Sequence, residues 1–283
     1  MGKRIDCVTI AQNVKDKVKK EITDRNLSLT LAVVLVGDDQ ASQIYVRNKV
    51  KVCEEVGIKS LAITVPNDVT QESLEGLINS LNRRKDVNGI LVQLPLPKHL
   101  NSDRVVGMIH PYKDVDGLSP INQGRLFGGI PSIVPCTPQG VITIIDSIGY
   151  DLSGKHVTVL GRSNLFGKPM AQLCLQRDAT VSMCHSKTQD WRRQQLIDIS
   201  DVVIVAIGKP KDVKFTMRST CSLVIDVGIN RVDGKIVGDV DEDTIRKFVH
   251  YTPVPKGVGV LTTATLMENV IKCYDLMLTL QSC

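Results

Sequence analysis

Short apolar runs alternate with amphipathic stretches over the first hundred residues of the chain. Three runs have the length and β-branched composition of buried strands, and three longer stretches repeat apolar residues with helical spacing. The predicted strands are Leu31–Val36, Ser60–Val65 and Gly89–Leu94, and the predicted helices are Ile10–Arg25, Ser42–Val56 and Gln71–Arg83. This alternation indicates a parallel sheet with right-handed crossover connections.

A second rhythm of the same kind follows a stretch with several prolines and glycines between His110 and Thr137. Its strands are expected at Val157 and Ala179 and over Val202–Ala206 and Leu223–Asp226, and a final helix is expected over Thr262–Leu280. The shift in composition predicts two α/β domains with parallel sheets, the second of Rossmann type, with a cleft between them. We place residues 1–120 and 262–283 in the first domain and residues 121–261 in the second. The final helix returns to the first domain in this prediction, because no further strand remains for it to cover.

The turn after the first strand of the second domain is predicted to bind phosphate. The apolar run Val157–Leu160 leads directly into Gly161, and a helix is expected to begin a few residues later. Such a turn leaves backbone N–H groups unpaired at one point, and the helix dipole adds positive charge there. The turn departs from the common dinucleotide fingerprint, since Ser163 replaces its second glycine and Gly167 comes one residue late. Tight packing of strand against helix remains an alternative for this turn taken alone.

The second strand of this domain favours NADP over NAD. Folds that bind NAD place an acid at the end of this strand, where it binds the ribose 2′-hydroxyl. Here the strand leads into Cys184-His185-Ser186-Lys187-Thr188, which contains no acid. Arg162 and Ser163 in the first turn, with Ser186 and Lys187, supply donors for a 2′-phosphate instead. A solvated loop cation is the alternative for Arg162 alone.

Composition and charge narrow the class of protein. A chain of 283 residues is long enough for two domains. Its content of 42% hydrophobic and 23% charged residues is typical of a globular protein. A formal net charge of +5 fits an anionic small-molecule substrate, and the chain lacks the basic clusters interleaved with aromatics that nucleic acid binding needs. No apolar run approaches the ~18 residues of a membrane span. The N-terminus lacks the apolar region of a secretory signal and does not resemble a transit peptide.

The cysteines indicate a reducing compartment. They lie at positions 7, 53, 136, 174, 184, 221, 273 and 283, and they form no C-x-x-C pair. Most fall in apolar stretches, where a free thiol behaves as a small hydrophobic group. We therefore expect a cytoplasmic protein with neither a zinc site nor a disulfide framework.

Four polar positions in the first domain are candidates for chemistry. Tyr45 and Lys49 lie one helical turn apart, although a solvated lysine beside a half-buried tyrosine is the alternative. Gln93 interrupts an apolar strand end, where parallel sheets bind ligands and where a buried amide needs partners. Asp114 and Asp116 occupy a turn-prone loop, and a local Asx turn or helix cap is the alternative for them.

Seven segments, taken in order along the chain, resemble the bifunctional methylenetetrahydrofolate dehydrogenase/methenyltetrahydrofolate cyclohydrolase family. They are Tyr45-Val46-x-x-Lys49, Gly89–Pro97, Lys113–Gly117, Pro135–Gly140, Gly161–Ser163, Cys184–Ser186 and Thr252–Pro255. The resemblance covers nearly the whole chain. It implies oxidation of 5,10-methylenetetrahydrofolate to 5,10-methenyltetrahydrofolate with NADP, followed by hydrolysis to 10-formyltetrahydrofolate. It also implies a homodimer that pairs through the nucleotide domain, and no added formyltetrahydrofolate synthetase domain is expected.

The resemblance implies a role for each matching residue in the first domain. Lys49 resembles the catalytic lysine that activates water and handles protons in the hydrolysis, and Gln93 resembles the amide that holds it. Tyr45 is expected to orient the folate. Asp116 is expected to bind the amino-pyrimidine end of the pterin, since a carboxylate accepts paired N–H donors.

Further binding residues follow from the same resemblance. Leu94 and Gly257 are expected to border the folate, and no metal is implied. The expected contacts to the cofactor are Gly161, Arg162, Ser163, Ser186, Thr137 and Ile229, of which Arg162, Ser163 and Ser186 resemble the contacts to the 2′-phosphate.

The chain departs from the family in one loop. After Thr252–Pro255 the family continues with glycine and later proline, where this chain has Lys256 and Val260. Lysine adopts positive φ less readily than glycine, so we expect the local backbone to differ. Three alternatives remain open: a monofunctional dehydrogenase of this family, a non-catalytic NADP- or folate-binding protein on the same fold, and a dehydrogenase for another small acid on a similar scaffold.

Overall fold

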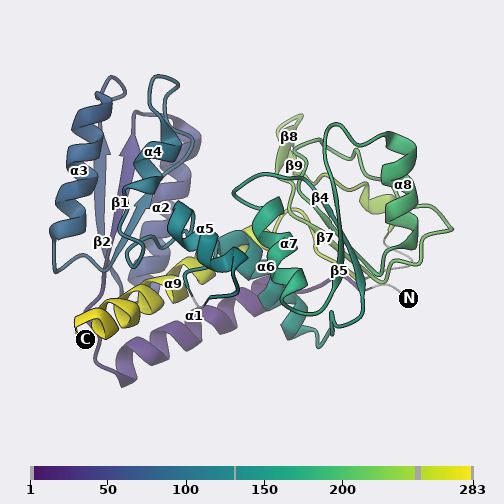
Figure 1. Cartoon of the computed structure of the whole chain (residues 1–283), viewed down its shortest axis with the longest axis horizontal. Coiled ribbons are helices and arrows are strands. Elements are labelled where there is room, and N and C mark those ends of the chain that lie inside the picture. The colour runs from purple at the N-terminus through teal and green to yellow at the C-terminus, as the bar shows by residue number, and fades with distance from the viewer. Residues whose placement is uncertain (1–2, 131, 246–249, 282–283) are drawn as a thin grey trace. The chain divides into compact units, whose positions relative to one another are not determined.

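The computed structural model of the chain describes residues 3–130, 132–245 and 250–281. The chain forms two compact units, each made of separate stretches of sequence (Figure 1). The first unit comprises Asn13–Cys136 and Thr263–Cys283, and the second unit comprises Met1–Gln12 and Thr137–Thr262. Both units contain a parallel sheet, which confirms the predicted fold class. Cys283 lies outside the described residues, and the other seven cysteines are free thiols.

The first unit is built on a sheet of three parallel strands. These are β1 (Thr30–Val36), β2 (Lys59–Val65) and β3 (Gly89–Val92), in the order β2-β1-β3. The helices of this part of the chain are α1 (Cys7–Asp24), α2 (Gln40–Val56), α3 (Gln71–Arg83), α4 (Ser102–Gly107), α5 (Pro120–Phe127) and α9 (Val258–Gln281). The strand order reverses at β1, so the carboxyl ends of β1 and β3 form the edge where such sheets bind ligands.

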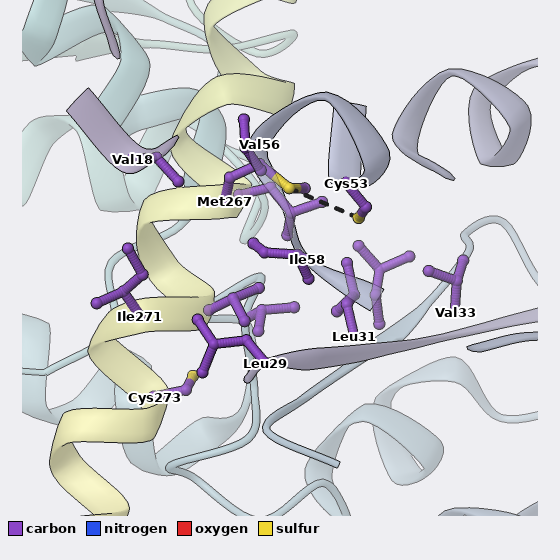
Figure 2. Packing of buried hydrophobic residues seen from close by; sticks show 14 of the residues in the cluster. Val18, Leu29, Leu31, Val33, Cys53, Val56, Ile58, Met267, Ile271 and Cys273 are labelled. Atoms are coloured by element: carbon purple, nitrogen blue, oxygen red, sulfur yellow. Dashed lines mark hydrogen bonds between the residues drawn. The ribbon is translucent and has the colours of Figure 1, made fainter. Parts of the chain in front are cut away.

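Both faces of this sheet are buried. Alternate residues of β1 point to opposite faces, so Leu31, Val33 and Leu35 join one apolar cluster while Ala32, Val34 and Val36 join another. The first cluster includes Val18 and Ile22 of α1 together with Cys53 and Val56 of α2. Met267, Ile271 and Cys273 of α9 pack into the same cluster, and Met267 lies 3.6 Å from Cys53, sulfur to sulfur (Figure 2). The final helix therefore covers the first sheet, as predicted.

The second unit contains a five-stranded parallel sheet. Its strands are β4 (His156–Leu160), β5 (Thr180–Cys184), β6 (Val202–Val205), β7 (Leu223–Asp226) and β10 (His250–Tyr251), in the order β10-β7-β6-β4-β5. The other elements are α6 (Cys136–Ser147), α7 (Gly167–Leu175), α8 (Asp190–Ile199), a 3-10 turn at Glu242–Thr244 and an antiparallel hairpin of β8 (Asn230–Val232) and β9 (Lys235–Val237). The order of the sheet reverses between β4 and β6, which places the expected nucleotide site at their carboxyl ends.

Residues 121–136 belong to the first unit, whereas the sequence analysis placed them in the second domain. Asn122 Nδ2 donates to Pro111 O at 2.8 Å and to Asp114 Oδ2 at 2.9 Å, and Ile133 is buried in the first apolar cluster. The N-terminal residues belong to the second unit, because Ile5 N donates to Tyr251 O at 2.9 Å. No helix within the described ranges is long and apolar enough to cross a membrane.

Candidate functional site

Lys49 and Gln93 meet at the carboxyl edge of the first sheet. Lys49 lies on α2, whose first turn is capped by Asp39 accepting from Ser42 N at 2.7 Å. Lys49 Nζ donates to Gln93 Oε1 at 3.0 Å, and Gln93 Nε2 donates to the carbonyl of Leu94 at 2.7 Å. The amide of Gln93 is thereby oriented with its oxygen toward the ammonium group. Gln93 follows β3 directly, because the strand ends at Val92 rather than at the predicted Leu94.

Asp116 belongs to the same site. Burial raises the pKa of its carboxyl, while the positive charge of Lys49 acts in the opposite direction. Cys136 Sγ donates to the carbonyl of Val115 at 3.3 Å, and burial together with the charge of Asp116 raises the pKa of that thiol well above its ordinary value. Tyr45 lies one turn before Lys49 on α2 with 49% of its surface exposed. The structure thus brings three of the predicted residues together and leaves the Tyr45 side chain open to a ligand.

The loop that carries Asp116 is fixed by its neighbours. Asp114 accepts from the backbone N–H groups of Leu118 at 3.3 Å and Ser119 at 2.8 Å, so this carboxylate has the local turn role weighed as an alternative. Lys113 is buried, and its Nζ donates to the carbonyl oxygens of Leu81, Asn82 and Arg84 at 3.2, 2.9 and 2.6 Å. These carbonyls end α3, so Lys113 ties the loop to that helix. Sequence reasoning did not single out Lys113.

The second unit contains a cavity of about 240 Å³ at the point where its strand order reverses. It is lined by Leu160, Gly161, Arg162, Ser163, Cys184, His185, Ser186, Arg193, Ala206, Ile207 and Lys209. The loops after β4 and β5 therefore meet in one pocket, as the sequence predicts for Arg162, Ser163 and Ser186. The Arg162 guanidinium is exposed and has no hydrogen-bond or ion-pair partner among the residues that the structure describes. Arg193 and Lys209 were not foreseen.

Two glycines allow the turn to pack closely. A Cβ at Gly161, whose φ is +122°, would lie 2.3 Å from the carbonyl oxygen of Ala206. A Cβ at Gly167 would lie 2.1 Å from the carbonyl oxygen of Gly161. Ser163 Oγ accepts from Phe166 N at 3.1 Å, which leaves the hydroxyl proton of Ser163 available to a ligand. This pocket of hydroxyl and guanidinium donors fits a phosphate group.

A buried carboxylate shapes the opposite wall of the cavity. Asp239 is fully buried, and it accepts from the N–H groups of Ile207, Gly208 and Lys209 at 2.7, 2.9 and 2.9 Å. Three consecutive donors hold the loop after β6 in one conformation and compensate the buried charge. Nothing in the sequence around Asp239 marks this role, because its partners lie about thirty residues earlier.

The remaining predicted residues lie outside this cavity. Thr137 Oγ1 is 3.2 Å from Thr262 Oγ1, and Ile229 is 53% exposed after β7. Gly257 is buried, and a Cβ there would lie 2.0 Å from Pro253 O. Within the described ranges, no group of three His, Cys, Asp or Glu side chains is placed to hold a metal ion.

The loop that departs from the family in sequence places Lys256 in a conformation that few lysines adopt. Lys256 has φ +68°, in the left-handed region that favours glycine. The expectation that the backbone here differs from that of the family therefore stays a prediction. The chain tolerates a lysine in an unfavourable conformation.

Two parallel α/β units, one with a Lys–Gln–Asp cluster and one with a phosphate pocket, define a two-domain nucleotide-binding enzyme. Residues 5–116 match the tetrahydrofolate dehydrogenase/cyclohydrolase catalytic domain, and residues 135–277 match the NAD(P)-binding domain of the same enzymes. The chain belongs to the tetrahydrofolate dehydrogenase/cyclohydrolase family. This confirms the resemblance seen in the sequence.

Individual relatives agree over nearly the full length. The bifunctional protein FolD of Agathobacter rectalis is 46% identical over 277 residues, which cover 96% of this chain and 99% of that protein. The crystal structure of FolD from Campylobacter jejuni is 41% identical with a TM-score of 0.93, and the match covers 98% of this chain and 100% of that one. FolD of Trypanosoma brucei, solved with NADP and an inhibitor, is 33% identical with a TM-score of 0.91 and covers 98% of each chain. The chain is a bifunctional dehydrogenase and cyclohydrolase of this family, with an NAD(P)-binding domain.

Proposed function

We propose that Lys49, Gln93 and Asp116 carry the folate chemistry of this chain and that Arg162, Ser163 and Ser186 bind the 2′-phosphate of NADP. The first reaction oxidises 5,10-methylenetetrahydrofolate to 5,10-methenyltetrahydrofolate, and the second hydrolyses that product to 10-formyltetrahydrofolate. The observation that carries the proposal is the 3.0 Å hydrogen bond from Lys49 Nζ to Gln93 Oε1, beside the Asp116 carboxyl.

The oxidation makes small demands on the protein. NADP supplies the hydride acceptor, and the carbon that loses the hydride becomes a cation stabilised by its two flanking nitrogens. No strong base is required, so the residues of the chain mainly have to hold the reactants at reacting distance. Tyr45 and Asp116 serve this purpose for the folate, through the aromatic ring and the carboxylate respectively.

The hydrolysis requires proton handling. Water adds to the methenyl carbon and loses a proton to Lys49 Nζ, which must first give up one of its own protons to act as the base. The resulting ammonium returns that proton to the ring nitrogen N5 as the bond between N5 and the carbon breaks. The second proton of the water is released as the formyl carbonyl forms, which balances the loss of the positive charge. Gln93 keeps the Lys49 nitrogen in place, because its Oε1 accepts a hydrogen bond from Lys49 Nζ.

Asp116 is suited to the amino-pyrimidine end of the pterin. An ionised carboxylate accepts two neighbouring N–H donors in paired fashion. Burial disfavours this ionised form in the free protein and so raises the pKa of Asp116. Donors from the folate would favour the charged form again, so binding of the folate and ionisation of Asp116 support one another.

The NADP assignment rests on the cavity of the second unit. Arg162 reaches it from the loop after β4, and Ser186 reaches it from the loop after β5. A guanidinium and two hydroxyl groups provide donors for the three phosphate oxygens. The end of β5 has no acidic side chain that could bind the ribose 2′-hydroxyl of NAD.

We also propose a cytoplasmic homodimer that pairs through the second unit. Free thiols at all seven described cysteines support the compartment. Val232 and Ile236 in the β8–β9 hairpin and Ile229 just before it are exposed apolar side chains, which supports pairing through this unit. Light scattering should give twice the 31.1 kDa mass of one chain, with a shift toward that single-chain mass for Ile236→Lys. A single-chain mass for the unaltered protein would exclude the dimer.

Lys49→Met tests the assignment of the catalytic lysine. The substitution keeps much of the stem volume and removes the amine, so hydrolysis of methenyltetrahydrofolate should fall by ~10²-fold or more, as is typical for loss of a general acid–base group. Formation of NADPH from methylenetetrahydrofolate should fall less, because that step needs alignment rather than proton transfer. The two rates are measured separately on each protein.

Lys51→Met is the matched control, since Lys51 is an exposed lysine on the same helix. It should leave both rates near those of the parent. Hydrolysis at the parent rate by Lys49→Met would remove Lys49 from the mechanism.

A further inference from the structure

One cationic residue of the cavity comes from an element that the family motifs do not include. Arg193 lies on α8 and lines the same cavity as Arg162, Ser163 and Ser186. Its side chain is 24% exposed, and its Nη1 donates to Asp212 Oδ2 at 2.7 Å. Its Nη2 also lies 3.4 Å from Asp190 Oδ1, on a side chain that is 90% exposed.

The charge of Arg193 is placed at the carboxyl end of β5. Burial raises the pKa of the Cys184 thiol, and the positive charge of Arg193 acts in the opposite direction. Cys184 is the last residue of β5, the strand that follows the phosphate turn and α7. In nucleotide folds of this kind, the end of that second strand is where the ribose 2′ position is recognised. Arg193 and the end of β5 line the same cavity, so Arg193 faces the region in which an NAD-specific fold would present an acid.

The contact with Asp212 leaves Arg193 able to bind a ligand. A guanidinium has five N–H donors, and the hydrogen bond to Asp212 uses one of them. The partnership fixes the direction of the side chain from the loop after β6, which lowers the entropy lost when a ligand binds. Both carboxylates that face Arg193 reach solvent, since Asp212 is 30% and Asp190 is 90% exposed, so water weakens both ion pairs and the guanidinium keeps N–H donors for the cavity.

We propose that Arg193, held by Asp212, is a second specificity-determining guanidinium that binds the 2′-phosphate of NADP from the α8 side of the cavity. This inference rests on the proposed cofactor site formed by Arg162, Ser163 and Ser186. Arg162 binds the phosphate from the turn after β4, and Arg193 binds it from helix α8. The alternative role of Arg193 is purely structural, as an ion pair that ties α8 to the segment at Asp212.

Adenosine 2′,5′-bisphosphate and AMP distinguish these roles, because the two probes differ only in the 2′-phosphate. Their dissociation constants are measured by titration calorimetry on the full chain without folate. Arg193→Gln should weaken binding of the bisphosphate by roughly tenfold, at the lower end for a charge-assisted contact because Asp212 shares the guanidinium. Binding of AMP should stay within about twofold, since AMP lacks the group that Arg193 contacts. A structural role would leave the ratio of the two constants unchanged.

Arg192→Gln is the matched control for the loss of charge. Arg192 is the preceding residue of α8, is exposed, stacks over the Trp191 ring at 4.7 Å and does not line the cavity. It should change neither constant. Arg193→Lys keeps the positive charge and loses the paired N–H donors of the guanidinium. Its affinity for the bisphosphate should therefore fall less than that of Arg193→Gln, by about threefold. If Arg193→Gln does not fold, the proposal is tested with Arg193→Lys instead. An unchanged ratio of the dissociation constants for the bisphosphate and AMP in that variant overturns the proposal.

Arg162→Gln separates failure of this inference from failure of the cofactor site on which it rests. An unchanged bisphosphate-to-AMP ratio for Arg193→Gln, with a lowered preference for Arg162→Gln, overturns the role of Arg193 alone. An unchanged ratio in both variants overturns the proposed cofactor site as well.

Discussion

Side chains at the folate site differ in how completely the protein holds them. Gln93 is 9% exposed and both ends of its amide are hydrogen bonded, whereas Tyr45 is half exposed. Lys49 has Gln93 as its partner on one side, and the charge of Asp116 lies near it on another. Groups that must keep one geometry are fixed by protein partners, and the group expected to contact the folate ring remains open.

His110 gives the stability of the first unit a specific pH dependence. Burial lowers the pKa of its imidazole below the ordinary 6.5, and the positive charges of Lys113 and Arg125 lower it further. Tyr112 N donates to His110 Nδ1 at 3.2 Å, a contact that a protonated ring cannot accept. The unfolded chain therefore binds the proton more readily than the folded one. The free energy of unfolding should fall as the pH is lowered through 6.5 toward the depressed pKa.

Chemical denaturation at a series of pH values measures this effect. His110→Asn retains an acceptor for Tyr112 N and does not titrate, so the slope in that window should become smaller. His250→Asn removes an exposed histidine and should leave the slope unchanged. An equal slope in the parent and in His110→Asn would show that another group is responsible.

At the residue scale, a polar side chain that interrupts an apolar pattern can be picked out from the sequence. Gln93 was identifiable in this way, whereas Asp116 was singled out by its turn-prone loop and by the family resemblance. Arg193 and Asp239 were not identifiable, since their partners lie 19 and about 30 positions away in the chain. Only the folded sheet brings those pairs together, and no local pattern records the contact.

At the scale of elements, the central strands and long helices follow from the sequence. Runs of valine, isoleucine and leucine can be buried on both faces only in a parallel sheet, so their positions were predicted to within about two residues. Helix α3 was predicted with the bounds Gln71–Arg83 that the structure shows. The final helix begins at Val258, four residues before the predicted Thr262, because the loop glycines do not prevent its first turn.

The short elements were missed for a different reason. Strand β10 has two residues and exists because β7 offers it a hydrogen-bonding edge, which no local propensity reveals. Helix α5 lies within the stretch interpreted as an irregular boundary, although Ser119 caps it and Pro120 occupies its first turn. The β8–β9 hairpin turns at Asp233-Gly234, which is a recognised hairpin signal that the sequence analysis did not use.

For the whole molecule, the family and the two-domain α/β class were predictable, and the division of the chain was less so. The structure changes unit after Gln12, Cys136 and Thr262, and each of these positions falls at or within a helix. The apolar periodicity of a helix does not change at the residue where the helix passes from one unit to the other, so the sequence does not show that boundary. The departure in composition near residue 120 reflects the loop that carries Asp116, rather than the place where the units separate.

In the proposed site, the choice of cofactor depends on residues from three elements of the second unit at once. Arg162, Ser186 and Arg193 come from three elements, and the cavity unites them. The phosphate donors are therefore a property of the assembled sheet, and the preference for NADP should be expressed in the complete enzyme rather than in any one motif.

The most direct test of the account is the initial rate of cofactor reduction with 5,10-methylenetetrahydrofolate, measured with NADP and with NAD under the same conditions. We predict that kcat/KM for NADP exceeds that for NAD by ~10-fold or more, the effect of at least one charge-assisted contact to the 2′-phosphate. Reduction of NAD with an equal or higher kcat/KM would contradict the account, because the cations around β5 would then have no 2′-phosphate to select.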